Sequence, residues 1–344
     1  MVDIQSLVRK NVRNLKPYSS ARDEFKGSAS VWLDANENPN NNGLNRYPDP
    51  LQKKLKARIS ELKKVPAGNI FLGNGSDEAI DLLFRGFCEP RKDKAVICSP
   101  TYGMYQVSAD INDVEMVELP LTLDWHLPLE HLRSLFSDDY MKLIFICSPN
   151  NPTGNSMKRE DILSLVSEFN GLVIVDEAYI DFSETESLTS ELGKFNNLVV
   201  LQTLSKAWGL AGIRLGMAFA NTEVIDVLNR IKPPYNVNQL TQEVALKELA
   251  DEAAFKKEVD AILSERTRLK TELSKLKRVE KIHPSDANFL LVKFVKAKAV
   301  YKALTEQGIV VRDRSKVAYG CLRITIGTSE ENTQLLAELK KLES

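Results

Sequence analysis

Short apolar runs alternate with longer segments of helical spacing between about residue 65 and residue 220. The runs with the character of buried strands are 95–98, 114–119, 143–147, 172–175, 198–202 and 215–220. Most of the segments between them have the length of a helix, such as 159–169. Apolar strands separated by helices are typical of a mostly parallel sheet that helices cover on both faces. The pattern therefore predicts a large α/β domain.

The chain changes character after Pro233 and Pro234. Residues 239–277 predict a long charged helix, and the elements expected beyond it are a strand at 288–294, a helix at 298–307, short strands near Val310 and Leu322 and a terminal helix from Ser329. This mixture is typical of a smaller α+β unit. We therefore expect three parts: an N-terminal arm at 1–44 that joins the small domain, a large domain at 45–234 and a small domain at 235–344.

A segment rich in Asn, Pro and Gly lies where the arm meets the large domain. It covers residues 34–50, DANENPNNNGLNRYPDP, and predicts a loop. A polar helix should follow at 51–64. Its lysines Lys53, Lys54 and Lys56 are expected to form one solvated face.

Composition and charge narrow the class of protein. The 344 residues include 46 basic and 47 acidic side chains, a net charge of -1, which does not favour a general nucleic-acid binder. The four cysteines form no C-x-x-C pair, and no stretch approaches the roughly 18 apolar residues of a membrane span. We therefore expect a cytoplasmic protein that acts on small molecules, with no nucleic-acid partner and no membrane partner.

Polar clusters follow three consecutive strands of the predicted sheet. Residues 148–154, SPNNPTG, come after one strand, residues 176–179, DEAY, after the next, and Ser205 and Lys206 after the third. Ligands of such sheets bind outside the carboxyl ends of the strands. The three clusters should therefore converge on one site.

Lys206 is the candidate nucleophile of that site. It follows a buried strand, with Ser205 before it and Arg214 eight residues later. A lysine in a desolvated pocket near other cations has a depressed pKa and can form a Schiff base with a carbonyl group. The hydroxyl groups of Thr203 and Ser205 and the guanidinium of Arg214 are donors of the kind that a phosphate requires.

Asp176 admits three interpretations, since it could be a turn residue, a metal ligand or the partner of a pyridinium nitrogen. No histidine or second acid stands at metal-ligand spacing, so no metal site is predicted. A carboxylate that keeps a pyridine ring protonated makes the ring an electron sink. Asn151 and Tyr179 are either turn residues or donors to an oxygen of such a ring. Residues 73–78, GNGSDE, should open a helix whose N–H groups suit a phosphate, although this signal is weak alone.

Motifs spread over nearly the whole chain resemble one enzyme family. They are LKPYSSAR, LDANENP, RYPDP, GNGSDEAID, SPTYGMY, SPNNPTG, VDEAY, TLSKAWGLAGIRLG, VVRDRS and GCLRITIG. In these motifs the chain resembles the fold-type-I pyridoxal-phosphate aminotransferases and, within them, the histidinol-phosphate aminotransferases. The resemblance implies the two-domain α/β fold of that family, pyridoxal 5'-phosphate as cofactor and a homodimer with shared active sites.

The resemblance also implies a role for each matching residue around the cofactor. Lys206 would form the Schiff base and shuttle the proton, and Asp176 would pair with the ring nitrogen. Asn151 and Tyr179 would bind the ring hydroxyl, and Tyr102 would stack on the ring. The phosphate contacts that it implies come from Ser205, Arg214 and the backbone of Ser76 and Asp77 and, from a neighbouring subunit, Tyr47.

The substrate contacts implied by the resemblance are mainly arginines. Arg323 would bind the α-carboxylate of glutamate and also a substrate phosphate, helped by Arg312 and Tyr18. Asn36 is a further candidate contact. Arg314 follows Arg312 by two residues, and the sequence does not decide which of the two faces the substrate.

Three reactions fit these motifs. The first converts L-histidinol phosphate and 2-oxoglutarate to imidazole acetol phosphate and L-glutamate, reversibly and by a ping-pong mechanism, in histidine biosynthesis. The alternatives are transamination of aromatic amino acids and decarboxylation of threonine phosphate. Arg312 and Arg323 together with Tyr18 favour a phosphate substrate, because its oxygens need several donors. A transcription factor is not expected, since only about 30 residues precede DANENP.

Overall fold

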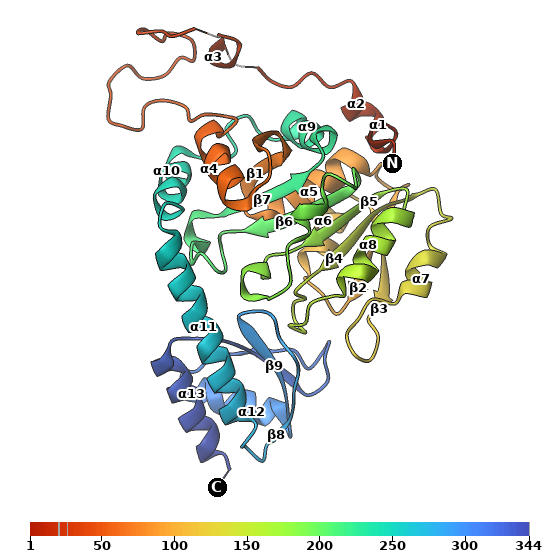
Figure 1. The fold of residues 1–344 in the computed structure, drawn as a ribbon, viewed down its shortest axis with the longest axis vertical. Coiled ribbons are helices and arrows are strands. Elements are labelled where there is room, and N and C mark those ends of the chain that lie inside the picture. Colours follow the sequence, from red (N-terminus) through yellow and green to blue (C-terminus); the bar gives the residue numbers. More distant parts are fainter. Residues whose placement is uncertain (20, 26, 344) are drawn as a thin grey trace.

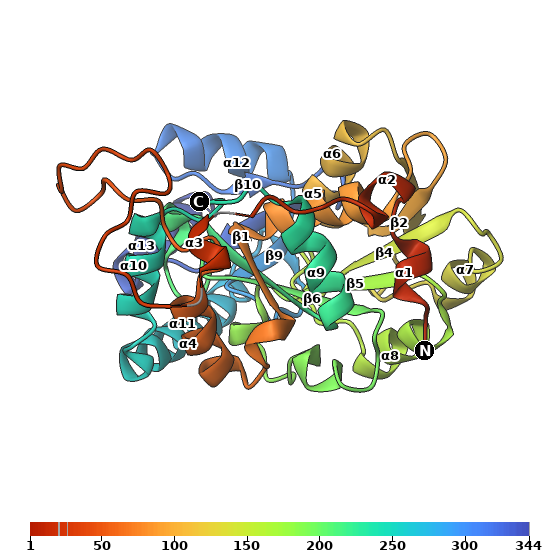
Figure 2. The ribbon, with the colours of Figure 1, turned by 90° about the horizontal axis from the view of Figure 1, so that it is seen from above.

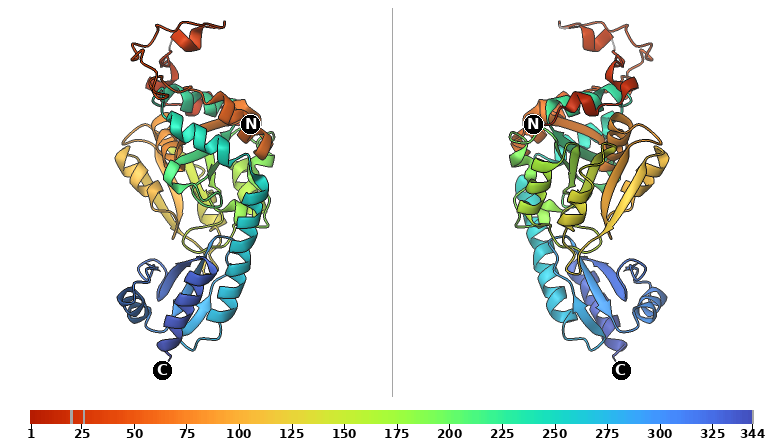
Figure 3. Two further views of the ribbon diagram at one scale, coloured as in Figure 1. Left: turned by 90° about the vertical axis from the view of Figure 1, so that its left-hand side faces the viewer. Right: turned by 90° about the vertical axis from the view of Figure 1, so that its right-hand side faces the viewer.

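Two sheets, one above the other, organise the chain in the computed structural model, which describes residues 1–19, 21–25 and 27–343. Ser20, part of the LKPYSSAR motif, lies outside the described residues. The larger sheet and its helices form the upper body in Figure 1, and the smaller sheet lies below it. Side views show a narrow waist between the two units, with α11 (Glu252–Leu273) along one edge (Figure 3).

The large sheet has seven strands, and the six strands expected from the sequence are all confirmed. In spatial order they are β1 (Ile70–Asn74), β7 (Leu215–Ala220), β6 (Leu198–Thr203), β5 (Leu172–Asp176), β4 (Met141–Cys147), β2 (Lys94–Ser99) and β3 (Glu115–Pro120). The β6–β5, β5–β4, β4–β2 and β2–β3 pairs are parallel, whereas β7 is antiparallel to both of its neighbours. The mostly parallel sheet is therefore confirmed. β1 was not expected, because its apolar run is only three residues long.

Helices cover both faces of the large sheet, because alternate residues of each apolar strand point into two separate cores. The helices that contribute buried residues to the first core are α1 (Ile4–Leu7), α2 (Lys10–Arg13), α5 (Ser76–Phe87), α6 (Met104–Ile111) and α9 (Thr222–Ile231). Those of the second core are α4 (Lys53–Lys63), α7 (Leu129–Ser134), α8 (Arg159–Glu168) and α10 (Gln239–Glu248). Burial on both faces leaves the strand ends as the open edge of the sheet.

The lysines of α4 do not form one solvated face. Lys53 and Lys54 are exposed, but Lys56 is buried, with only 7% of its surface accessible. Lys56 precedes the buried Ile59 by three residues, and side chains three apart share a helix face. The expectation was therefore wrong for Lys56, which lies on the packed side of the helix.

The small unit consists of an antiparallel sheet and three long helices. Its strands, in spatial order, are β10 (Arg312–Asp313), β11 (Cys321–Thr325), β9 (Phe289–Phe294) and β8 (Val279–Ile282), and its other helices are α12 (Ala297–Glu306) and α13 (Ser329–Lys341). The carboxyl-terminal part of α11 packs with α12 and α13 around β9 and β11. This confirms the α+β character expected for the region, although β8 was not foreseen.

The segment 239–277 is two helices and not one. The helical conformation is interrupted at 249–251, between α10 and α11. There the side chain of Asp251 accepts a hydrogen bond from Ala254 N–H and caps α11. α10 still packs on the large sheet, so the chain passes to the small unit only along α11. Among the described residues no helix combines the length and the apolar character that crossing a membrane would need.

The N-terminal arm lies at the large unit, not at the small one as expected. Ile4, Leu7 and Val12 of α1 and α2 are buried in the core shared with α5 and α9. Seen from above, α1 and α2 lie on the side of the large unit that carries α5 and α9. The arm with α3 (Ala21–Glu24) then loops away from the large unit (Figure 2). The apolar residues of its first two helices hold the arm to the large core.

Candidate active site

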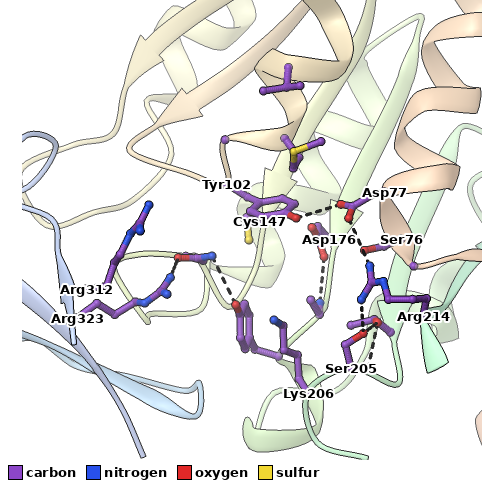
Figure 4. Close-up of a pocket in the computed structure, with 18 of the residues that line it drawn as sticks. Ser76, Asp77, Tyr102, Cys147, Asp176, Ser205, Lys206, Arg214, Arg312 and Arg323 are labelled. Carbon is purple, nitrogen blue, oxygen red and sulfur yellow. Dashed lines mark hydrogen bonds and ion pairs between the residues drawn. The ribbon is translucent and has the colours of Figure 1, made fainter. Parts of the chain in front are cut away.

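A pocket of about 550 Å³ opens at the carboxyl ends of β4, β5 and β6, where the sequence placed the polar clusters. The predicted residues that line it are Ser76, Asp77, Tyr102, Asn151, Asp176, Tyr179, Thr203, Ser205, Lys206, Arg214, Arg312 and Arg323. Figure 4 shows Arg214 and Ser205 at one end and Arg312 and Arg323 at the other, with Asp176 and Lys206 between them. The pocket therefore has a cationic arginine end on either side, and at the first of them Arg214 Nη2 also lies 3.7 Å from Asp77 Oδ2.

The first cationic end is built from the loop after β6 and the start of α5. Arg214 Nη1 lies 3.5 Å from Ser205 Oγ, and Thr203 Oγ1 lies 3.0 Å from the same hydroxyl oxygen. Gly75 caps α5 without a side chain, at φ +74°, and a Cβ there would lie 2.6 Å from Arg214 Nη2. Glycine is therefore required for the guanidinium to approach the helix N-terminus, whose free N–H groups favour an anion.

Asp176 ends β5 in the middle of the pocket and is buried, with 3% of its surface accessible. Its carboxylate accepts hydrogen bonds from Tyr105 Oη–H at 2.7 Å and from Ala178 N–H at 3.0 Å. Burial raises the pKa of Asp176, and these two bonds and Lys206 oppose that shift. Within the described residues no salt bridge reaches this carboxylate. A buried carboxylate without a salt bridge is costly in free energy unless a cation pairs with it.

Lys206 stands beside this carboxylate in the loop after β6. Its side chain is open to water from the pocket, yet enough protein surrounds it for desolvation to lower its pKa. The nearby charges of Arg323 and Arg214 lower that pKa further, whereas Asp176 and Asp77 oppose them. Nζ lies 5.6 Å from the centre of the Tyr179 ring. The site thus holds a lysine that loses its proton more easily than a surface lysine.

Asn151 connects the two units across the pocket. Its Oδ1 accepts a short hydrogen bond from Arg323 Nη1, and its Nδ2 donates to Tyr179 Oη at 3.4 Å. Burial raises the pKa of Tyr179, so its phenol stays protonated and can donate. Tyr102 lines the wall nearby and donates from its hydroxyl to Asp77 Oδ1 at 3.0 Å.

The second cationic end contains three arginines, not two. Arg312 and Arg323 pair across β10 and β11, and Arg314 also lines the pocket. The choice between Arg312 and Arg314 that the sequence left open therefore has no single answer. Both face the pocket.

Three predicted site residues lie in the arm or in the loop that joins it to the large domain, and they do not line the pocket of their own chain. Tyr18 is 69% exposed and lines a separate hollow near Tyr235. Tyr47, 51% exposed, stacks on the ring of Tyr235 with centroids 4.5 Å apart. Asn36 lies in the predicted loop at φ +55°. The structure of one chain does not bring these three side chains to Lys206.

Sequence reasoning missed Tyr105, which holds the central carboxylate. Tyr105 is fully buried, and its ring packs edge-on against Tyr102 at 5.5 Å between centroids. Both tyrosines belong to the PTYGMY segment, but only Tyr102 was singled out. The signal available was a second tyrosine three residues later. Its hydrogen bond to Asp176 joins α6 to the end of β5, which no local pattern of the sequence indicates.

Comparisons with known proteins show the family to which this chain belongs. A model of the family "Aminotransferase class I and II" matches residues 19–339, and the chain belongs to that family. The curated histidinol-phosphate aminotransferase of Parabacteroides distasonis is 58% identical to this chain, with 99% of each covered. That of Cytophaga hutchinsonii is 51% identical, with 98% of each covered.

Solved structures share the architecture. The crystal structure of the histidinol-phosphate aminotransferase from Clostridium acetobutylicum is 26% identical, with a TM-score of 0.80 over 87% of this chain and 91% of that one. The fold, the aminotransferase class of enzyme and the resemblance to histidinol-phosphate aminotransferases that the sequence indicated are all confirmed.

Proposed function

We propose that this chain transaminates L-histidinol phosphate with 2-oxoglutarate, using pyridoxal 5'-phosphate, as a step of histidine biosynthesis. The observation that carries the proposal is the position of Lys206 between two cationic ends of one pocket. One end suits the phosphate of the cofactor and the other suits the phosphate of a substrate. The names of the relatives at 51% and 58% identity point to the same substrate.

The residues present fit the cofactor. Asp176 is a buried carboxylate without a salt bridge among the described residues, as a protonated ring nitrogen requires. Gly75 leaves room for Arg214 beside the N-terminus of α5, as a phosphate requires. The phenol of Tyr179 and the amide of Asn151 stand together as donors for a ring hydroxyl. Tyr102 has the flat side chain to stack on the ring.

Pyridoxal phosphate, when bound, supplies a protonated ring that stabilises negative charge at the reacting carbon. Lys206 would hold the cofactor and, once released, take a proton from the substrate carbon and return it. Its lowered pKa suits this work, because a general base is most effective when its pKa lies near the working pH. Asp176 would stay ionised and keep the ring nitrogen protonated.

Arg323 would bind the anionic end of each substrate, helped by Arg312. Its Nε is buried without a hydrogen-bond partner in the described part of the chain, so it is available to an incoming oxygen. Arg323 also donates to Asn151, which links the substrate end to the cofactor end. Tyr18 and Asn36 would reach the substrate only from the arm of another subunit.

We propose a homodimer in which the arm completes the neighbouring pocket and Tyr47 contacts the phosphate of the neighbour's cofactor. The arm exposes many large apolar side chains, as expected for a surface that a second chain covers. They are Leu15, Tyr18, Phe25, Val31, Leu33 and Leu44, and Tyr47 and Leu51 follow directly after the arm.

Mixed dimers test the shared site. Tyr47→Ala and Lys206→Ala subunits, each inactive or weak alone, should regain activity when mixed. One site of each mixed dimer then carries both native residues, so about a quarter of all sites should work after random exchange. Mixtures no better than the single variants would place Tyr47 outside the neighbour's site.

A half-reaction test decides the substrate. Each amino donor is added to the yellow enzyme without an acceptor, and the loss of the yellow absorbance is followed. Histidinol phosphate should react far more efficiently than histidinol, histidine, phenylalanine or threonine phosphate, because a missing phosphate leaves buried donors unpaired. Glutamate should also react. Faster reaction of phenylalanine or tyrosine would make the enzyme an aromatic aminotransferase, and release of carbon dioxide from threonine phosphate would make it a lyase.

A further inference from the structure

The third arginine of the pocket continues the ladder between β10 and β11. Arg312 is the partner of Arg323, and Asp313 is the partner of Leu322. Arg314 N–H then donates to the carbonyl oxygen of Cys321 at 3.0 Å, which extends the same register by one residue. Side chains two apart on an extended strand point to the same face. Arg312, Arg314 and Arg323 therefore share one face, and all three line the pocket.

Arg314 is set deeper than Arg312 and has no anionic partner among the residues that the structure describes. Arg312 is exposed, whereas Arg314 is half-buried and its Nε is shielded from water without a hydrogen bond. No salt bridge to Arg314 exists within residues 1–19, 21–25 and 27–343. Burial and the charges of Arg323 and Arg312 lower its pKa. A partly buried guanidinium next to two others raises the free energy of the empty pocket, and an anion that enters the pocket would offset this cost.

The number of charges indicates which anion. A carboxylate carries one negative charge and two oxygens, so Arg323 and Arg312 already exceed its requirement. A phosphate monoester carries about -1.5 to -2 charges at pH 7 and three acceptor oxygens. We infer that Arg314 is a further substrate-binding residue, which binds the second charge of a phosphate dianion and makes the pocket prefer it to a carboxylate. The inference rests on the proposed function.

The test compares two substrates in one protein. Arg314→Gln should lower kcat/KM for histidinol phosphate by about 10- to 100-fold, the effect of losing a hydrogen bond to a charged group. The value for glutamate should change by less than about threefold, because its carboxylates keep Arg323 and Arg312. Arg314→Lys should restore part of the loss, since it restores the charge without the fork.

A pH series adds a readout that a merely structural role would not change. The second pKa of a phosphate is about 6, so wild-type KM for histidinol phosphate should rise as the pH falls through 6. Without Arg314 the second charge is worth less, and this rise should flatten. Lys316→Gln is the matched control. It removes one positive charge from an exposed position on the same loop that does not line the pocket, and it should leave both substrates unchanged.

The outcomes separate the inference from the function it rests on. A wild-type enzyme that does not react with histidinol phosphate overturns the proposed function. A wild-type enzyme that reacts, with equal losses for both substrates or none in Arg314→Gln, overturns the role of Arg314. If Arg314→Gln does not fold, the same ratio measured in Arg314→Lys decides, because that variant keeps the positive charge.

Discussion

The surrounding protein lowers the pKa of two lysines of this chain, each near a second cation, and only one of them lines the pocket described above. Lys206 lies in the loop after β6, and Lys56 lies on the packed side of α4. Desolvation lowers the pKa of both side chains, and for Lys56 it lowers the pKa to about 8, with help from the charge of Lys232. A depressed lysine pKa therefore does not by itself identify a catalytic lysine.

The surroundings of the two lysines differ in what they leave open. Lys206 faces a pocket and stands beside the carboxylate of Asp176, with donors for anions on either side. Lys56 is enclosed by packing, and the Nζ of neighbouring Lys232 donates to the carbonyl oxygens of Pro50 and Pro234. The convergence of complementary groups on an open pocket distinguishes the first lysine from the second.

The largest effect is expected at Lys206. Lys206→Ala should lower turnover by about 10⁴-fold or more, because the nucleophile and the proton-transfer group are lost together. The fold and part of the cofactor affinity should remain. Absorbance and single-turnover rates measure this, and borohydride should bleach the yellow wild type. An enzyme that still transaminates without cofactor colour would contradict the proposed mechanism.

Asp176→Asn should follow in size. The amide has no charge to hold the ring nitrogen protonated, and the loss of such a preorganised electrostatic group costs about 10²- to 10³-fold in kcat. Cofactor affinity should fall less. A variant within a few-fold of the wild type in steady-state kinetics would show that Asp176 is only a turn residue.

Tyr105→Phe should have a moderate effect, about tenfold in kcat, through the carboxylate that Tyr105 positions. Its hydrogen bond lowers the pKa of Asp176, so its loss should raise that pKa further. The acid limb of the pH–rate profile should then move to higher pH. Tyr140→Phe, at an exposed tyrosine, is the control and should leave the profile in place. An unshifted acid limb in Tyr105→Phe would remove Tyr105 from the mechanism.

Lys56→Met should leave the activity unchanged and should stabilise the fold. Lowering a pKa from 10.5 to about 8 corresponds to up to about 3 kcal/mol of destabilisation below pH 8. Between pH 8 and 10.5 the unfolded chain keeps a proton on Lys56 that the folded chain has released. The free energy of unfolding of the wild type should therefore rise with pH across this window, and the advantage of Lys56→Met should shrink.

Urea unfolding at pH 7 and at pH 10 measures that difference. Lys53→Met, at an exposed position of the same helix, is the matched control and should change little at either pH. Equal stability of Lys56→Met and wild type at pH 7 would mean that the burial of Lys56 is compensated elsewhere. Loss of activity in Lys56→Met would contradict the conclusion that only Lys206 of these two lysines takes part in the reaction.

The sequence by itself determined the parts of the molecule that depend on local pattern. Apolar runs of strand length and polar residues at their ends were sufficient to place Lys206, Asp176 and Asn151 at one edge of a parallel sheet. The placement does not depend on the details of packing, because the carboxyl ends of parallel strands always lie at the same edge of their sheet. The segments SPNNPTG, DEAY and TLSKAWGLAGIRLG indicated the family because the functional residues of each motif are close together in the chain.

Only the tertiary structure decided what depends on contacts between distant segments. The hydrogen bond from Tyr105 to Asp176 joins residues 71 positions apart in the sequence. The hydrogen bond from Arg323 to Asn151 joins residues 172 positions apart. The burial of Lys56, the presence of Arg314 in the pocket and the position of the arm at the large unit likewise follow from packing. Local spacing gives a residue its face on a helix or strand, but the partner that covers that face comes from elsewhere in the chain.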